Sequence, residues 1–178
     1  MSNLQDFGTT YSGVAYAFTT KPDQIYTINE WPGAKGRTAP KVPTLIKYDD
    51  PDNFRWGYEL DRTTKERIEG IKLLLDPDQP KPLYVPAVNT EAQLKRLGKP
   101  AIEVATDYIG ALYRYAMQKI EAKYPKSYLD MLDRRFILSV PAVWSDKAKD
   151  ATLRVSLPIL VQGSCALTLT AGCPSCWY

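Results

Sequence analysis

The chain has 178 residues, of which 44% are apolar and 24% charged, and its formal net charge is +3. This balance is typical of a globular domain and excludes a largely disordered chain, which needs low hydrophobicity and high net charge. The small net charge, with no basic stripe, argues against nucleic-acid binding. The sequence has no apolar run long enough to cross a bilayer, so we expect no membrane-spanning helix.

Two further absences narrow the function. The sequence contains no histidine, which excludes Ser-His-Asp and Cys-His nucleophilic catalysis and every histidine-ligated metal site. The first residues contain neither the basic segment nor the apolar segment of a secretory signal. We therefore expect a cytoplasmic protein that has neither a membrane nor a nucleic acid as its partner.

The first elements predicted along the chain are strands. Val14–Phe18 and Ile25–Ile28 are apolar and aromatic runs, and the turn signal Lys21-Pro22-Asp23 between them predicts a hairpin. Val42–Tyr48 is expected to be extended, and Phe54–Gly57 to form a short strand. The N-terminal part is therefore predicted to be built from strands.

Two helices are predicted next. Thr63 with Glu66 fits a capping box, so a short helix is expected to follow through Ile71. Asp76–Pro86 contains four prolines and is expected to be an irregular connection. From about Pro100 to Tyr124, apolar residues recur every three or four positions, which predicts one long amphipathic helix.

The last elements complete the fold class. Phe136–Val140 is a continuous apolar run, typical of a strand buried on both faces. Ser145-Asp146 can cap a further helix that begins near Lys147. Strands, a long helix, a buried strand and a helix start, in this order, predict an α/β fold.

The composition changes abruptly after Arg154. Every charged residue lies at or before that position, and residues 155–178 carry none. We therefore predict a domain over residues 1–154 and a charge-free apolar tail over 155–178 that is not part of the native domain. Such a tail is explained by divergent splicing, by a shifted reading frame or by an unusual apolar extension.

The tail also holds all the cysteines. Cys165, Cys173 and Cys176 are an odd set at one end of the chain, which is not a disulfide framework. Cys173 and Cys176 have the C-x-x-C spacing of a redox site or of half a zinc site. No second pair and no histidine complete four zinc ligands, so the tail gives only an alternative hypothesis of thiol or metal chemistry.

The segment Asp6-Phe-Gly-Thr-Thr-Tyr-Ser-Gly13 carries the main candidate chemistry. A turn of small residues between two strands can point successive N–H groups at a phosphate. Gly8 allows a close approach, and Thr9 and Thr10 add hydroxyl donors. The carboxylate of Asp6 at the head of the turn suits a hydrated Mg²⁺. The alternative from spacing alone is a tight hairpin turn that binds no ligand.

The same segment resembles the first phosphate loop of the DnaK-type, 70-kDa heat-shock chaperone ATPases. Other stretches resemble that family in the same order: Lys41-Val-Pro-Thr44, Trp56-Gly57, Ile71-Lys-Leu-Leu-Leu-Asp-Pro77 and Val140-Pro-Ala-Val-Trp-Ser-Asp146. The sequence around the tryptophans is most similar to that of the divergent heat-shock-like proteins abundant in fungi. The resemblance covers about residues 4–154. It implies one incomplete lobe of the actin-like ATPase fold, built on a ribonuclease-H-like βββαβα unit.

The resemblance also implies residue roles. Asp6 would be a catalytic residue that acts on Mg²⁺ and its waters. The residues around the β- and γ-phosphates of ATP would be Gly8, Thr9, Thr10 and Tyr11. Lys72 would be a second catalytic residue, which stabilises the charge on the transferring phosphoryl group or positions the attacking water. The alternative for Lys72 is a solvated lysine on a short amphipathic segment.

We therefore expect an ATP-binding lobe of a heat-shock-chaperone-like ATPase. The family's second phosphate loop, adenosine-binding glycines and second lobe have no counterpart after residue 154, so we expect weak or undetectable Mg-ATP binding and no ATPase activity from this chain alone. Nucleotide is the expected ligand, with co-chaperones or client proteins as further partners. The alternative is a non-catalytic interaction fragment, or an aberrant gene product, without nucleotide activity.

Overall fold

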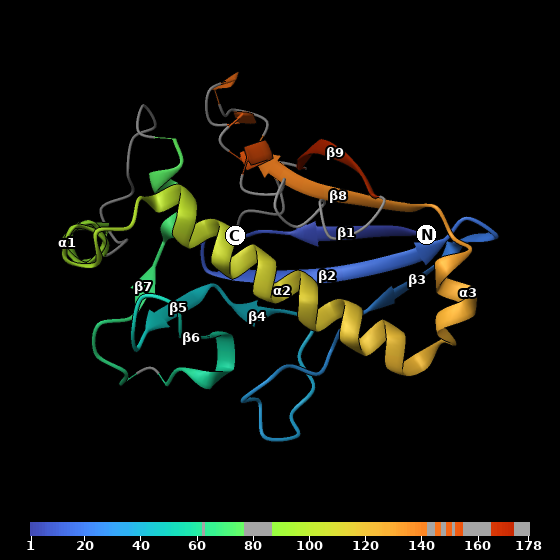
Figure 1. Cartoon of the computed structure of the whole chain (residues 1–178), viewed down its shortest axis with the longest axis horizontal. Helices are drawn as coiled ribbons and strands as arrows, with labels where there is room; N and C mark the ends of the chain where they lie inside the picture. The colour runs from blue at the N-terminus through green and yellow to red at the C-terminus, as the bar shows by residue number, and fades with distance from the viewer. Residues whose placement is uncertain are drawn as a thin grey trace.

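The computed structural model describes residues 1–61, 63–76, 87–141, 145–146, 149–150, 152–154 and 165–172. Over these ranges the chain is a mixed α/β structure with a larger and a smaller β-sheet. Figure 1 shows one long helix lying across the larger sheet, with the smaller sheet beside it near the start of that helix. The candidate loop lies where the two sheets approach each other.

The larger sheet is built around its first strand. Its strands are β1 (Ser2–Asp6), β2 (Tyr11–Phe18), β3 (Lys21–Thr27), β8 (Arg134–Pro141) and β9 (Cys165–Gly172), in the spatial order β3-β2-β1-β8-β9. β2 runs antiparallel to β1 and β3, whereas β1, β8 and β9 are parallel neighbours. The C-terminal end of β1, an inner strand of this mixed sheet, therefore leads into the candidate loop.

The smaller sheet connects to the larger one through β4 (Val42–Pro43), which pairs with the start of β2. It contains β5 (Leu45–Tyr48), β6 (Phe54–Trp56) and β7 (Ile68–Glu69), in the order β6-β5-β7. Two 3₁₀ helices follow its strands, η1 (Gly57–Glu59) and η2 (Ile71–Leu74). The helix α1 (Ala87–Leu97) contacts β7 and η2.

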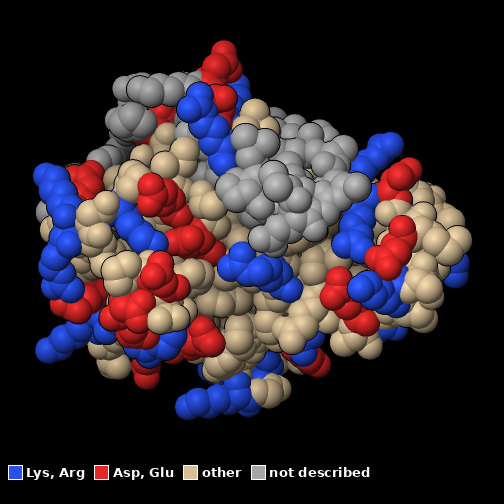
Figure 2. Space-filling model, viewed as in Figure 1, with Lys and Arg blue, Asp and Glu red and all other residues tan. Residues whose placement is uncertain are grey.

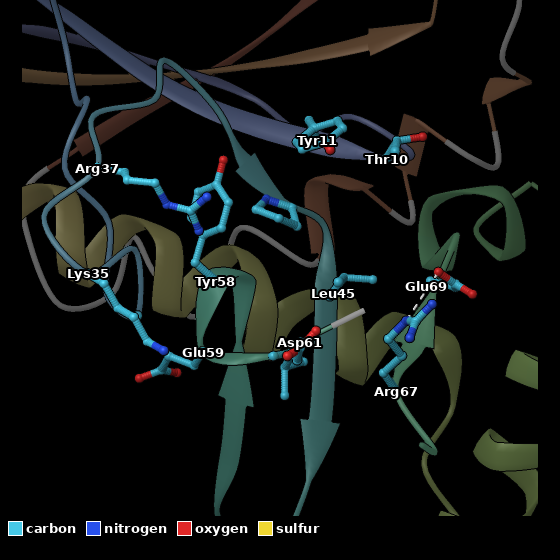
Figure 3. A pocket seen from close by; sticks show the side chains of 13 residues that line it. Thr10, Tyr11, Lys35, Arg37, Leu45, Tyr58, Glu59, Asp61, Arg67 and Glu69 are labelled. Carbon is cyan, nitrogen blue, oxygen red and sulfur yellow. Dashed lines mark ion pairs between the residues drawn. The ribbon is translucent and has the colours of Figure 1, made fainter. Parts of the chain in front are cut away.

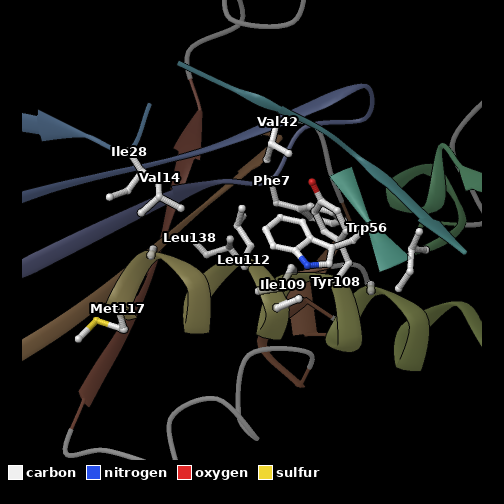
Figure 4. Packing of buried hydrophobic residues seen from close by; sticks show 14 of the residues in the cluster. Phe7, Val14, Ile28, Val42, Trp56, Tyr108, Ile109, Leu112, Met117 and Leu138 are labelled. Atoms are coloured by element: carbon white, nitrogen blue, oxygen red, sulfur yellow. The ribbon is translucent and has the colours of Figure 1, made fainter. Parts of the chain in front are cut away.

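The main core lies between the larger sheet and α2 (Ala101–Lys123). The buried residues of α2 recur every three or four positions, as expected for an amphipathic helix. Figure 4 shows side chains of the sheet and of α2 meeting in this layer, among them Phe7, Val14, Leu138, Tyr108 and Leu112. A short helix, α3 (Lys126–Asp130), follows α2 and leads into β8.

The structure confirms the main elements that the sequence predicts. The run Val14–Phe18 lies in β2, and Ile25 lies in β3. The long helix begins after Pro100 and ends before Tyr124. Phe136–Val140 lies in β8.

The predicted hairpin turn is misplaced. Lys21 already belongs to β3 and pairs with Phe18, so the turn consists of Thr19 and Thr20. Pro22 lies within β3, which forms one edge of the larger sheet. An edge strand tolerates the missing N–H of a proline, so the Lys-Pro-Asp sequence does not force a turn here.

The short helix predicted after Thr63 is wrong. Glu66 has a φ of 63°, which is not a helical value, and Ile68 pairs with Ile46 in β7. The Thr64 hydroxyl accepts from the Asp61 amide, so it stabilises a turn and not a helix start. The burial of Ile68 in the small sheet outweighs the weak local capping signal.

Burial on both faces of β8 is also wrong. Phe136, Leu138 and Val140 are buried, whereas Ile137 and Ser139 are only half-buried. The buried set shares one face of the strand because side chains alternate along it. That face meets the core beneath α2.

Two helices have no counterpart in the sequence prediction. α1 has a narrow buried stripe among its described side chains, formed by Thr90 and Leu94. α3 is a single short turn of helix with Leu129 buried. Of the expected irregular connection Asp76–Pro86, residues 77–86 lie outside the described residues. The helix predicted to follow Ser145-Asp146 agrees with the helical residues that the structure describes after Ser145.

Part of the charge-free tail joins the larger sheet. Each residue of β9 pairs with a residue of β8, from Arg134↔Cys165 to Pro141↔Gly172. The domain boundary at residue 154 stays a prediction. Cys173 and Cys176 lie outside the described residues.

Among the helices that the structure describes, none combines the length and the apolar character needed to cross a bilayer.

Candidate functional site

The predicted phosphate loop connects β1 to β2. The two strands pair up to Asp6↔Gly13, so residues 7–10 leave the ladder. Phe7 is 1% exposed and its ring lies 6.0 Å from that of Tyr108 in α2. Thr10 and Tyr11 are exposed. The loop therefore has one end fixed in the core and one end open to solvent.

Thr44 fixes the shape of the loop from the side of the smaller sheet. Its hydroxyl donates to the Gly8 carbonyl at 2.9 Å, and its amide donates to the Thr10 carbonyl at 2.8 Å. The Ser12 hydroxyl lies 2.8 Å from the Thr44 hydroxyl, and both side chains are buried. Because the Thr44 proton is used on Gly8, Ser12 is the donor of this pair. Two loop carbonyls are thus held inward.

The amides of the loop are used differently from its carbonyls. Within the described chain, the amides of residues 8–10 donate no backbone hydrogen bond. A Cβ atom at Gly8 would lie 2.0 Å from the Tyr11 carbonyl oxygen, so only glycine fits this bend. Successive N–H groups without internal acceptors can bind an anion.

The structure brings Lys72 to this loop across 65 residues of sequence. Lys72 lies on η2, is 1% exposed, and donates from its ammonium to the Phe7 carbonyl. Burial lowers the pKa of Lys72 to about 7, although the nearby Asp6 carboxylate acts to raise it and Lys41 to lower it further. The alternative of a solvated lysine is therefore wrong, because this cation is held inside the protein beside the loop.

Asp6 lies between two side chains from other elements. Lys41 places its ammonium 2.9 Å from Asp6 Oδ2, and the Ser139 hydroxyl donates to Oδ1 at 2.8 Å. The Asp6 side chain is 38% exposed. A single accessible carboxylate suits a Mg²⁺ ion that keeps most of its waters. The donor set fits such an ion once the Lys41 ammonium leaves Oδ2.

A dedicated protein cage for a metal is not found in the described part of the chain. No group of three or more acidic or cysteine side chains there surrounds a common point. Any Mg²⁺ at Asp6 would therefore depend on phosphate oxygens and water for its other ligands.

Four residues of the site were not identified as functional from the sequence. Lys41, Thr44 and Ser139 contact Asp6 or the loop from β-strands or their flanks. Asp76 is 1% exposed and accepts from the Ser145 amide and hydroxyl, each at 3.3 Å. Lys41 and Thr44 carried a sequence signal, since both belong to the stretch Lys41-Val-Pro-Thr44 of the resemblance, and Asp76 belongs to the stretch Ile71-Lys-Leu-Leu-Leu-Asp-Pro77.

A pocket of about 660 Å³ borders the loop on its exposed side. Figure 3 shows Thr10 and Tyr11 on one side of this pocket and Tyr58 and Arg37 on the other. Neither Asp6 nor Lys72 lines it. The pocket therefore shares Thr10 and Tyr11 with the predicted phosphate site but does not include its two predicted catalytic residues.

The surface charge is mixed. Figure 2 shows lysine and arginine side chains interspersed with acidic ones on the visible face, where no large region has a single sign. This face therefore carries no broad basic field.

Comparison with known proteins gives a weak but consistent similarity to two heat shock 70 kDa proteins. The chain matches no known protein-family model. It is 28% identical over 163 residues to heat shock 70 kDa protein 12A of Homo sapiens, which covers 81% of this chain and 22% of that protein. Heat shock 70 kDa protein 12B of Homo sapiens is 29% identical over 160 residues, with the same coverage. The chain thus spans about a fifth of the length of these relatives, 22% in both cases. The similarity supports a relation to the heat-shock-70-like, actin-like ATPases and does not single out the DnaK-type group.

Proposed function

We propose that this chain is one ATP-binding lobe of a divergent DnaK-type ATPase, with a ribonuclease-H-like unit at its centre. The arrangement of the larger sheet supports this proposal. An antiparallel β1–β2–β3 meander is followed by the long helix α2 and then by two strands parallel to β1. This is the order of strands and helix that a βββαβ unit requires.

The phosphates of ATP would bind at the loop between β1 and β2. The observation that carries this proposal is the placement of Lys72, whose ammonium is buried against the Phe7 carbonyl, beside loop amides that donate no backbone hydrogen bond within the described chain. In such a buried setting a positive charge interacts more strongly with an anion than it would in water. Lys72 would therefore stabilise negative charge developing on phosphate oxygens bound at the loop.

The other loop residues would position the nucleotide. Gly8, Thr9, Thr10 and Tyr11 would surround the terminal phosphates with amides and hydroxyls. Asp6 would hold the water shell of Mg²⁺, which supplies charge neutralisation of the phosphates when it is bound. Because Asp6 and the loop come from the same edge of the sheet, both can contact one phosphate chain.

Binding by this chain alone is expected to be weak. Each charge-assisted hydrogen bond contributes about 1.5–3 kcal/mol, and a site that spans only one lobe provides part of the full set. A dissociation constant of about 1 mM corresponds to about 4 kcal/mol of binding free energy. We therefore expect millimolar affinity.

A titration of Mg-ATP up to about 10 mM, followed by tryptophan fluorescence, tests this function at the affinity expected here. Trp56 reports on the site because its ring lies 5.9 Å from Tyr108, which contacts Phe7. We expect a saturable change that Thr9→Ala abolishes and that Thr20→Ala, a matched change in the distant β2–β3 turn, preserves. A flat titration, or an equal response in both variants, would contradict the proposal and favour a non-catalytic interaction fragment.

A further inference from the structure

Lys41 occupies a position beside Asp6 that neither the sequence nor the comparisons assign to any role. Its ammonium lies 2.9 Å from Asp6 Oδ2, and the two side chains are 47% and 38% exposed. The pair joins the segment just before β4 to the end of β1. The ammonium therefore lies on the accessible side of the carboxylate, where a hydrated cation would approach.

Neighbouring residues hold Lys41 in this place. A Cβ atom at Gly13 would lie 3.4 Å from Lys41 Cγ and 3.2 Å from the Pro40 carbonyl, so glycine leaves room for the lysine to cross β2. The Tyr58 hydroxyl donates to the Lys41 carbonyl at 3.1 Å. Val42, the next residue, is fully buried and pairs with Ser12. The backbone from which Lys41 reaches Asp6 is thus fixed on several sides.

A second lysine lies close to this pair. Lys72 donates to the carbonyl of Phe7, the residue that follows Asp6. A divalent ion at Asp6 would have to displace the Lys41 ammonium or share the carboxylate with a like charge. Like charges at such short range repel each other, so the Lys41 ammonium and a divalent metal ion exclude one another at Asp6.

We propose that Lys41 is a tethered cation that competes with divalent metal for Asp6, so that phosphate binding at this site depends less on Mg²⁺ than it would without the lysine. The nucleotide part of this inference rests on the proposed function. The competition at Asp6 does not, because it concerns the carboxylate and a metal ion alone. Exposed ion pairs are worth about 0.2–1 kcal/mol, which corresponds to about a 1.4- to fivefold effect on metal affinity.

The competition can be measured with Mn²⁺ alone on the whole ¹⁵N-labelled chain. Paramagnetic broadening of the Phe7 and Ser139 amides reports Mn²⁺ at Asp6. We expect Lys41→Gln to raise the Mn²⁺ affinity about 1.4- to fivefold, and Lys41→Arg to keep it at the wild-type value because the charge is retained. The matched control is Lys119→Gln, which breaks another exposed ion pair, that between Lys119 and Glu30 at 2.7 Å.

Each outcome decides the inference. Equal Mn²⁺ broadening in wild type and Lys41→Gln would overturn it, as would an equal rise at Asp6 in Lys119→Gln. Adding Asp6→Asn to Lys41→Gln should abolish the gain. ATP titrations with Mg²⁺ or with EDTA then extend the test: the preference for Mg-ATP should be greater in Lys41→Gln than in wild type. If no nucleotide binds to either protein, the proposed function fails while the Mn²⁺ result still stands.

Discussion

The strand β1 and the loop that follows it treat their buried polar groups in opposite ways. In the loop, the Gly8 carbonyl accepts from Thr44 and the Phe7 carbonyl accepts from Lys72. Within the strand, Asn3 Oδ1 and both polar side-chain atoms of Gln5 are buried, and no partner for them exists within the described structure. An unsatisfied buried polar group costs about 1–3 kcal/mol. Buried polar groups therefore stabilise the loop and destabilise the strand that leads into it.

This difference indicates the role of the polar groups that contact the loop. Their partners come from η2 and from the connection between β4 and β5, which are distant in sequence. The sheet alone does not require them, because the loop residues lie outside the ladder. They fix a loop whose amides remain available for a ligand.

The largest expected effect on stability concerns the core that the loop and the sheets share. Tyr108 is fully buried and contacts the rings of Phe7 and Trp56. Tyr108→Ala should lower the free energy of unfolding by about 3–5 kcal/mol, because a large aromatic ring leaves a cavity. Denaturant unfolding measures this loss. Met131→Ala, at a residue that is 84% exposed, should change stability little. Equal effects of the two changes would contradict the assigned core.

The second prediction concerns pH and the buried cation at the loop end. The pKa of Lys72 is about 7 in the folded chain and near its usual value of 10.5 when unfolded. Between these values the unfolded state binds more protons, so wild-type stability should rise with pH by at most about 1.4 kcal/mol per unit. Lys72→Met should remove this rise. Unfolding of both proteins from pH 7 to pH 10 measures it, and parallel pH profiles would contradict the buried, perturbed ammonium.

The third prediction removes a polar group that has partners. Thr44→Val keeps the shape of a side chain that is 1% exposed but deletes the donor to the Gly8 carbonyl. We expect a loss of about 1–3 kcal/mol, because buried hydrogen-bonding groups are left without partners. Thermal or denaturant unfolding gives this value. A neutral result would show that the loop does not depend on Thr44.

The fourth and smallest prediction has the opposite sign. Gln5→Met keeps the length of a fully buried side chain and removes two polar atoms that have no partner in the described residues. We expect a gain of about 1 kcal/mol in the free energy of unfolding, because the desolvation cost of the amide disappears. The same unfolding assay measures it. A loss of stability would mean that the Gln5 amide is hydrogen-bonded, and the contrast between β1 and the loop that follows it would then fail.

The sequence predicts those parts of this molecule in which a local pattern decides the structure. The periodicity over Ala101–Lys123 is long and regular, so tertiary packing and helix propensity agree. The segment Asp6–Gly13 connects β1 to β2, and its small residues are followed by the apolar run Val14–Phe18. In both cases the nearest neighbours in sequence supply enough information.

The remaining parts depend on contacts between distant residues. Ile68 becomes a strand because Ile46 pairs with it, although the local sequence suggests a helix. The partners of Asp6 are 35 and 133 residues away in sequence, so neither Lys41 nor Ser139 shows a local signal for this role. The role of Lys72 was suggested only by resemblance. Its burial and its contact with Phe7 required the structure.

The most direct test of the account is an ATP titration of the ¹⁵N-labelled chain, with and without Lys72→Met. If the loop between β1 and β2 binds phosphate, the amide resonances of Gly8, Thr9 and Thr10 should shift in wild type and remain unchanged in the variant. Shifts confined to the pocket around Lys35 and Tyr58, or loop shifts that persist in Lys72→Met, would contradict the assignment of this loop and lysine to the phosphates.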